Sequence, residues 1–225
     1  MEKPTDLRAV VFDAYGTLFD VYSVGLLAEQ LYPGRGDALS VLWRDKQIEY
    51  TRLASMSGHY KPFWDLTRAG LRFATQRLGL ALDAPTEDRL MNQYRHLSAF
   101  PENLDVLREL KSRGIPTGIL SNGDPDMLAV AVKSAGFTDC LDHVLSVHEI
   151  RKYKTDPAAY ALGPQAYKLP AKQILFVSSN GWDAIGATWY GYTTLWVNRY
   201  GLPMEQLDTA PTRIGTSLRD VLSFF

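Results

Sequence analysis

The sequence predicts an α/β protein in which a doubly wound parallel sheet carries an all-helical segment inserted after the first strand. Three observations lead to this fold class. Short apolar runs recur along the chain, helix start signals lie between the later runs, and a long stretch near the N-terminus contains no such run. The chain has 225 residues, which is enough for one large domain or two small domains that share a core.

Five apolar runs indicate buried parallel strands, at residues 9–12, 117–120, 143–147, 174–178 and 193–197. They contain many β-branched residues and no polar alternation, which is typical of strands covered on both faces. Asp124-Pro125 and Asp156-Pro157 each predict a helix start, with Asp as the N-cap and Pro as the first helical residue. Strands that alternate with helices in this way favour a doubly wound sheet.

The stretch from about residue 21 to 99 predicts only helices. Its amphipathic parts are 38–53, 63–79 and 86–97. The stretch is too long for a crossover, so we expect a separate cap of residues 21–97 inserted into a core of residues 1–20 and 98–225. Such a cap would lie over the carboxyl ends of the strands, where open α/β sheets bind their ligands.

The composition excludes several classes of function. The net charge is −1, which gives no electrostatic reason to expect a nucleic acid or an anionic membrane as partner. The one cysteine, Cys140, permits no internal disulfide and fits a reducing compartment. No apolar run approaches the length of about 20 residues that a membrane span needs, and the N-terminus lacks a signal-like apolar stretch. We therefore expect a soluble cytoplasmic protein.

Polar motifs follow the predicted strands. They are Asp13-Ala14-Tyr15-Gly16-Thr17, Ser121-Asn122-Gly123, Lys154, and Ser178-Ser179-Asn180-Gly181-Trp182-Asp183. Each motif alone has an ordinary interpretation as a turn, a helix cap or a surface lysine. Because the carboxyl ends of parallel strands share one edge of the sheet, the four motifs together predict one site.

These motifs resemble those of the haloacid dehalogenase superfamily, and within it the L-2-haloacid dehalogenases. The phrases "FDAYGTLFDVYSV", "LWRDKQIEYT", "ILSNG" and "LFVSSNGWDAIGA" carry the resemblance, which spans nearly the whole chain. It implies a Rossmann-like core with a helical cap. It also implies a hydrolase without cofactor or metal that converts short (S)-2-haloalkanoic acids to (R)-2-hydroxyalkanoic acids through an aspartyl ester, with halide as the second product.

Tyr15 separates this activity from the main alternative in the superfamily, a magnesium-dependent phosphatase. The phosphatases carry a DxD motif, whereas in this chain Tyr15 occupies the position of the second acid. Asp13 and Asp183 alone would make a poor magnesium site, since hard cations prefer several oxygen ligands. A departing halide also needs no proton. A non-catalytic binding protein of this fold is the other alternative, and the joint presence of Asp13, Ser121, Lys154 and Asp183 speaks against it.

The resemblance assigns the first chemical step to three groups. Asp13 would be the nucleophile, with a turn cap as the alternative. Lys154 would keep Asp13 ionised, with a surface lysine as the alternative. Arg44 would bind the halide together with Asn122 and Trp182, with an exposed arginine on an amphipathic helix as the alternative.

Further residues would hold the substrate. Ser121 would bind its carboxylate with the help of backbone N–H groups near Ala14, and Thr17 would orient Asp13. Tyr15, Ile48, Phe63 and Trp182 would form an apolar wall, an interpretation that overlaps with simple core packing.

The second step, ester hydrolysis, would depend on Asp183 as the base or water-positioning group, oriented with Asn180 and Ser178. The alternative for Asp183 is an acid in the first turn of a helix at 182–191. Tyr160 would support the site by a hydrogen bond, or would be a core tyrosine. Pro164 lies inside the helix expected after Asp156-Pro157, which also carries Tyr160, and predicts a kink or break there.

A homodimer is expected because relatives are often dimeric. The cap also carries many apolar and aromatic residues, among them Trp43, Tyr50, Leu71 and Phe73, which predict an unburied apolar surface.

Overall fold

A six-stranded parallel sheet forms the centre of the molecule. This computed structural model describes residues 6–225. The strand order is β3-β2-β1-β4-β5-β6, with all pairings parallel. The strands are β1 (Ala9–Phe12), β2 (Thr117–Ser121), β3 (His143–Ser146), β4 (Ile174–Ser178), β5 (Thr193–Val197) and β6 (Arg213–Gly215). The predicted fold class is confirmed, and the five predicted strands lie within a residue of their expected bounds.

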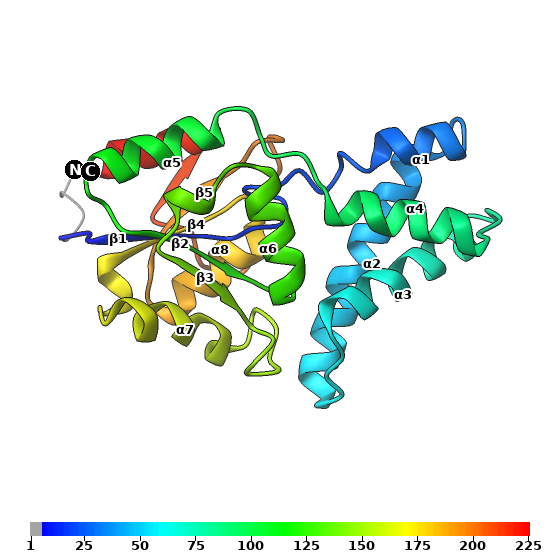
Figure 1. Cartoon of the computed structure of the whole chain (residues 1–225). Helices are drawn as coiled ribbons and strands as arrows, with labels where there is room; N and C mark the ends of the chain where they lie inside the picture. The colour runs from blue at the N-terminus through cyan, green and yellow to red at the C-terminus, as the bar shows by residue number, and fades with distance from the viewer. Residues whose placement is uncertain (1–5) are drawn as a thin grey trace.

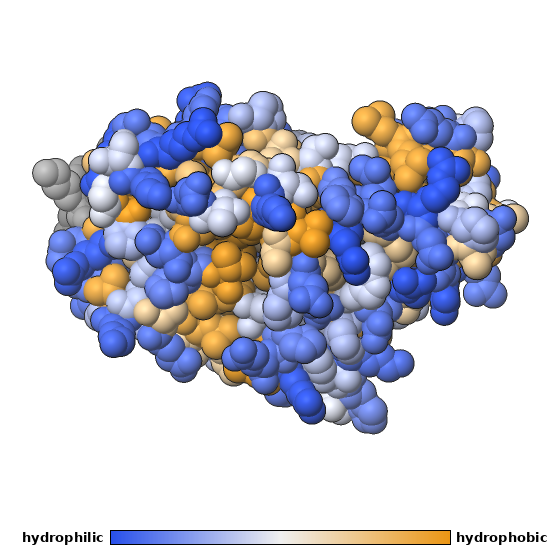
Figure 2. Space-filling model, viewed as in Figure 1, coloured by the Kyte–Doolittle hydropathy of each residue, from blue (hydrophilic) through white to orange (hydrophobic). Residues whose placement is uncertain are grey.

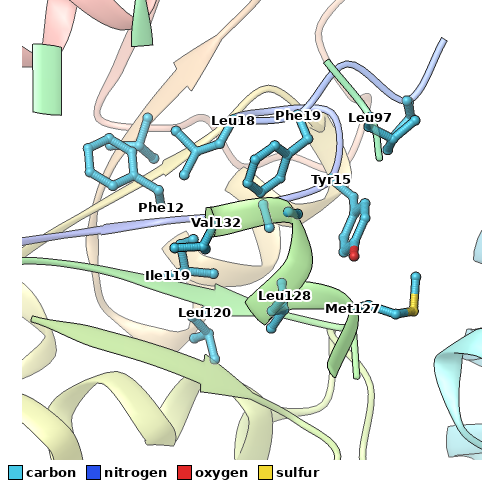
Figure 3. Close-up of a cluster of buried hydrophobic side chains, with 14 of the residues drawn as sticks. Phe12, Tyr15, Leu18, Phe19, Leu97, Ile119, Leu120, Met127, Leu128 and Val132 are labelled. Atoms are coloured by element: carbon cyan, nitrogen blue, oxygen red, sulfur yellow. The ribbon is translucent and has the colours of Figure 1, made fainter. Parts of the chain in front are cut away.

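Helices cover both faces of this sheet. Helices α5 (Asn103–Ser112) and α6 (Pro125–Ser134) lie on one face, and α7 (Pro157–Tyr167) and α8 (Gly181–Tyr190) lie on the other (Figure 1). Short 3-10 turns occur at Thr138–Cys140, Ala171–Gln173 and Leu218–Phe224. Figure 3 shows how β1, β2 and α6 enclose part of the core, with Phe12, Ile119 and Leu128 packed between them.

One strand differs from its prediction. Strands β1, β2, β4 and β5 are buried along their whole length, as expected for strands covered on both faces. β3 is only partly buried, and Val144 is 44% exposed. The expectation of full burial is wrong there, because β3 pairs with β2 alone at the edge of the sheet.

Four helices lie between β1 and α5. They are α1 (Gly25–Leu31), α2 (Gly36–Ser57), α3 (Phe63–Arg77) and α4 (Ala84–Arg95). Figure 1 shows them grouped beside the sheet, beyond the end at which β1 finishes. The three predicted helices of this stretch are confirmed, and α1 is an addition. The division into a core of 1–20 and 98–225 and a cap of 21–97 stays a prediction, and its first residues, 1–5, lie outside the described chain.

The four helices have an apolar interior of their own. Trp43 and Leu71 are buried in it, and the ring of Trp43 lies 5.2 Å from that of Tyr94, centroid to centroid. Two of the residues expected to leave an apolar surface are therefore already covered within one chain. Of the described helices, none is long and apolar enough to span a membrane.

The two predicted helix starts differ in where the Asp side chain binds. Asp156 accepts a hydrogen bond from the Ala158 N–H at 2.9 Å, as a cap of α7 should. Asp124 precedes α6 but makes no cap hydrogen bond to it. Its carboxylate instead accepts from the N–H groups of Phe63 and Trp64, at the start of α3. The predicted start of α6 is confirmed, with Asp124 at the N-cap position and Pro125 as the first helical residue. Only the side-chain cap is missing, since a partner distant in sequence binds the carboxylate.

Pro164 does not break its helix, because α7 continues from Pro157 to Tyr167. Proline has no N–H and leaves the carbonyl of residue 160 without its helical donor. The Tyr192 hydroxyl donates to that carbonyl at 2.6 Å. Gly163 makes room for this bond, since a Cβ there would collide with the Tyr192 hydroxyl. The prediction of a broken helix is therefore wrong, because a side chain from outside replaces the missing donor.

We predict that Tyr192→Phe lowers the free energy of unfolding by about 1–3 kcal/mol, the usual cost of an unsatisfied buried acceptor. The loss should be clearly smaller in a Pro164→Ala background, where the new alanine supplies its own N–H to the Tyr160 carbonyl. Urea unfolding of the two single variants and the double variant measures this coupling. Equal losses in the two backgrounds would contradict the assignment.

Candidate active site

The carboxyl ends of three neighbouring strands bring the predicted motifs together. β1 lies between β2 and β4 in the sheet, so Asp13 lies between Ser121, the last residue of β2, and Ser178, the last residue of β4. All three side chains are buried. This is the edge of the sheet toward which the four helices α1 to α4 are placed (Figure 1).

A buried ammonium group joins two carboxylates at this edge. The Lys154 Nζ lies 3.0 Å from Asp13 Oδ1 and 2.9 Å from Asp183 Oδ2. Burial lowers the pKa of Lys154, but the attraction of the two carboxylates outweighs it, so that the pKa is raised above its ordinary value. Lys154 is therefore a cation inside the protein. The alternative of a surface lysine is excluded by its 1% exposure.

The second oxygen of Asp13 is held by neutral donors. The Thr17 hydroxyl and the Asn180 Nδ2 each donate to Asp13 Oδ2 at 2.9 Å. Thr17 is itself fixed by the Ser179 N–H, which donates to its Oγ1 at 2.8 Å. With Lys154 on Oδ1, the carboxylate is bound at both oxygens and has one fixed orientation.

Asp183 lies in the first turn of α8, so its interpretation as a first-turn acid is confirmed. Tyr160 donates to Asp183 Oδ1 at 2.7 Å, while Lys154 binds Oδ2. Burial raises the pKa of Asp183, and the attraction of Lys154 offsets only part of this effect. Burial and the neighbouring Asp183 raise the pKa of Tyr160 well above its usual value, so Tyr160 serves as a neutral donor.

A small cavity opens beside Asp13. Its lining comes from the β1 and β2 ends and from α2, α3 and α8, and consists of Asp13, Tyr15, Arg44, Ile48, Thr51, Phe63, Ser121, Asn122 and Trp182. The centre of a water-sized sphere can occupy only about 10 Å³ of it, about the room that one water molecule needs. Sequence reasoning named all of these residues except Thr51. Thr51 shares a helical face with Arg44 and Ile48, a spacing that could have revealed it.

Arg44 points into this cavity and is 7% exposed, so the alternative of an exposed arginine is wrong. Its guanidinium donates to Gln47 Oε1 at 2.8 Å and to the Tyr15 carbonyl at 3.0 Å. Within residues 6–225 no carboxylate lies within ion-pair distance of it. A buried cation that lacks an acidic partner is costly, and an anion in the cavity would compensate it. Gln47, which sequence reasoning missed, holds Arg44 in place.

Ser121 and Asn122, which line the cavity, also bind backbone N–H groups, and further predicted residues lie outside the lining. Asn122 Oδ1 accepts from the Lys154 N–H at 2.9 Å, and Ser121 Oγ accepts from the Gly123 N–H at 3.0 Å. Ser178 Oγ accepts from the Asn180 N–H at 3.1 Å. Ala14 is buried behind Asp13. The carboxylates of Asp13 and Asp183 are thus held by Thr17, Lys154, Tyr160 and Asn180. Ser178 contributes by binding the Asn180 N–H.

A family profile described as haloacid dehalogenase-like hydrolase matches residues 7–191. The chain belongs to this family. Among curated members, the (S)-2-haloacid dehalogenase of Pseudomonas sp. strain YL is 46% identical over 97% of this chain and 94% of its own length. The resemblance found in the motifs is confirmed.

Solved structures of family members agree over nearly the whole chain. A crystal structure of an L-2-haloacid dehalogenase is 63% identical with a TM-score of 0.96, covering 98% of this chain and 99% of that one. The Xanthobacter autotrophicus L-2-haloacid dehalogenase with chloropropionic acid covalently bound is 36% identical with a TM-score of 0.89, covering 96% of both chains.

The donor set around Asp13 differs from what a divalent cation prefers. Lys154 already occupies the position between the two carboxylates, and Tyr15 contributes an aromatic ring that packs on Phe63 and Tyr94. In the described part of the chain, no group of three His, Cys, Asp or Glu side chains is arranged to hold a metal.

We predict that Tyr160→Phe shifts the protonation of Asp183 to higher pH. The Tyr160 hydrogen bond lowers the pKa of Asp183, so its loss should raise a pKa that burial has already raised. The carboxyl chemical shift of carbon-13 labelled aspartate, followed against pH, measures this change. Tyr32→Phe, in which the lost hydroxyl binds the distant Ala81 carbonyl, is the control. An unchanged or lower midpoint would contradict the proposed contact.

Proposed function

We propose that this chain hydrolyses short (S)-2-haloalkanoic acids to (R)-2-hydroxyalkanoic acids through an ester on Asp13. The observation that carries the proposal is the pairing of a fixed Asp13 carboxylate with a buried Arg44 that has no acidic partner among the described residues, both on one small cavity. A carboxylate nucleophile and an anion site on one cavity suit the displacement of a halide. The curated relatives named (S)-2-haloacid dehalogenase support this substrate class.

In the first step, an Asp13 oxygen would attack C2 of the substrate. The new bond is a C2–O ester bond, and the carbon–halogen bond breaks with its electron pair leaving on the halide. The halide would depart into the part of the cavity that is lined by Arg44, Asn122 and Trp182. Attack from the side opposite the halogen inverts C2, which accounts for an (R) product from an (S) substrate.

In the second step, water would attack the carbonyl carbon of the Asp13 ester. Asp183 would take a proton from that water as a base, or would position the water for attack. The donors on the Asp13 carboxyl group, Thr17 and Asn180 among them, would stabilise the negative charge that develops on the carboxyl oxygen of the tetrahedral intermediate. The hydroxy acid leaves with the original Asp13 oxygen, and the water oxygen remains on the enzyme.

A magnesium-dependent phosphatase has less support. Tyr15 has no carboxylate to offer as a metal ligand. Burial raises the pKa of its hydroxyl well above its usual value, so it is also a much weaker acid than the second Asp of phosphatases. A phosphate dianion beside Asp13 and Asp183 would also meet repulsion.

A single turnover in oxygen-18 water, with enzyme in excess and EDTA present, tests the covalent route. We expect (S)-2-chloropropionate to give unlabelled product, because its hydroxyl oxygen comes from Asp13. The label should appear in the peptide that contains Asp13. Labelled product with an unlabelled peptide would make Asp13 a base that activates water. An absence of chloride release would overturn the substrate class.

We also propose that residues 21–97 act as a cap and that the protein works in the cytoplasm. The cap would supply Arg44, Ile48 and Phe63 to the cavity. Because the cavity has room for about one water molecule, substrate binding would need the helices or the lining side chains to move. The cytoplasmic assignment rests on the single, buried Cys140.

We predict a homodimer. Several large apolar side chains of α1 and α2 are exposed, namely Leu26, Val41, Leu53 and Met56, and Figure 2 shows an apolar area over α1. Such side chains favour association through this region. Light scattering at micromolar concentration should give twice the 25.2 kDa mass of one chain, and a monomer mass would contradict the prediction.

A further inference from the structure

A buried carboxylate outside the cavity joins the helices to the sheet. Asp124 follows the Ser121-Asn122-Gly123 motif at the end of β2 and is 9% exposed. Its Oδ1 accepts from the Phe63 N–H at 3.0 Å, and its Oδ2 accepts from the Trp64 N–H at 2.8 Å. No step of the proposed reaction uses this group.

Asp124 acts as the cap of a helix to which it does not belong. The N-cap position of α3 is Pro62, which provides no side-chain acceptor. The first N–H groups of a helix need acceptors from outside it, and a negative charge there also gains from the helix dipole. Asp124 supplies both from a position about 60 residues later in the chain.

A second set of contacts reaches the same helix start. His148 Nδ1 lies 3.1 Å from Asp124 Oδ1 and 3.0 Å from the Tyr60 hydroxyl. The Tyr60 ring stacks on Tyr153 with centroids 5.3 Å apart, and the Tyr153 hydroxyl donates to the Lys61 carbonyl at 2.6 Å. The residues just before α3 are thus held both by the contact of Tyr60 with His148 and by the hydrogen bond from Tyr153 to Lys61.

The residue that begins α3 is also part of the cavity. Phe63 is 2% exposed, lines the cavity and packs on Tyr15 with ring centroids 5.5 Å apart. Its backbone N–H is bound by Asp124, three residues after Ser121 and two after Asn122. The Asp124 carboxylate therefore links the backbone of Phe63 directly to the loop that carries Ser121 and Asn122.

We infer that Asp124 is a positioning residue that sets the size of the alkyl group the cavity accepts. It acts through Phe63 and touches no reacting atom. This inference rests on the proposed function for its substrates, but the contact itself can be measured without them. If Asp124 only stabilised the fold, its removal would lower stability without changing the preference between substrates.

The first measurement is amide hydrogen exchange in Asp124→Asn. The substitution keeps the size of the side chain but removes its charge and turns an NH₂ group toward one of the two N–H groups. We expect faster exchange at Phe63 and Trp64. Asp83→Asn is the matched control, because Asp83 caps α4 by accepting from the Thr86 N–H at 2.9 Å and lies outside the cavity. Unchanged exchange at Phe63 and Trp64 would overturn the inference.

The second measurement is the ratio of kcat/KM for 2-chlorobutyrate to that for 2-chloropropionate. One methylene in an apolar pocket is worth roughly 10- to 200-fold, so a displaced Phe63 should change the ratio by about fivefold or more in Asp124→Asn, chiefly through KM. Asp83→Asn should leave it unchanged. An unchanged ratio in Asp124→Asn, with lowered stability, would reduce Asp124 to a structural cap. A wild-type enzyme that releases no halide would instead refute the proposed function, and the exchange result would still decide whether Asp124 holds Phe63.

Discussion

The structure depends on one ammonium group held between two carboxylates. Lys154 binds Asp13 and Asp183 at 3.0 and 2.9 Å, and all three groups are nearly or fully buried. Removing one partner of such a cluster leaves an uncompensated buried charge, which costs about 3–5 kcal/mol. The three residues come from the end of β1, the loop before α7 and the first turn of α8. Their attraction therefore fixes these segments to one another and orients the groups proposed for both chemical steps.

The helices α1 to α4 complete what the sheet begins. The sheet edge supplies the carboxylates and small polar groups, whereas α2 supplies Arg44, Ile48 and Thr51, and α3 supplies Phe63. Each side depends on contacts from the other: Arg44 donates to the Tyr15 carbonyl, and the start of α3 is capped by Asp124. The cavity is a product of these contacts, since neither side encloses it alone.

Features fixed by local chemistry could be predicted from the sequence. The buried strands follow from apolar runs, and the grouping of Asp13, Ser121 and Asn180 follows from their position after parallel strands. The errors concern partners distant in sequence. The partner of the Asp124 side chain and the donor to the Tyr160 carbonyl both lie far along the chain. Strand β6 was not predicted, because its three residues, Arg213–Gly215, are too few to show a periodic pattern. The exposure of β3 depends on its place at the edge, which a run of residues does not reveal.

The formal charges of the groups around the cavity bear on the release of products. Asp13 and Asp183 balance Lys154 and Arg44, so the empty centre is formally neutral. A haloacid anion brings one excess negative charge into a poorly hydrated space. In the proposed reaction, departure of the halide after Asp13 is esterified would restore neutrality. The excess charge would return when hydrolysis has re-formed the Asp13 carboxylate and the proton taken by Asp183 has left the site. Because uncompensated charge is costly in a buried site, the four groups proposed for the chemistry would also favour the departure of each anion after it forms. In the proposed reaction, electroneutrality would thus favour the release of both products.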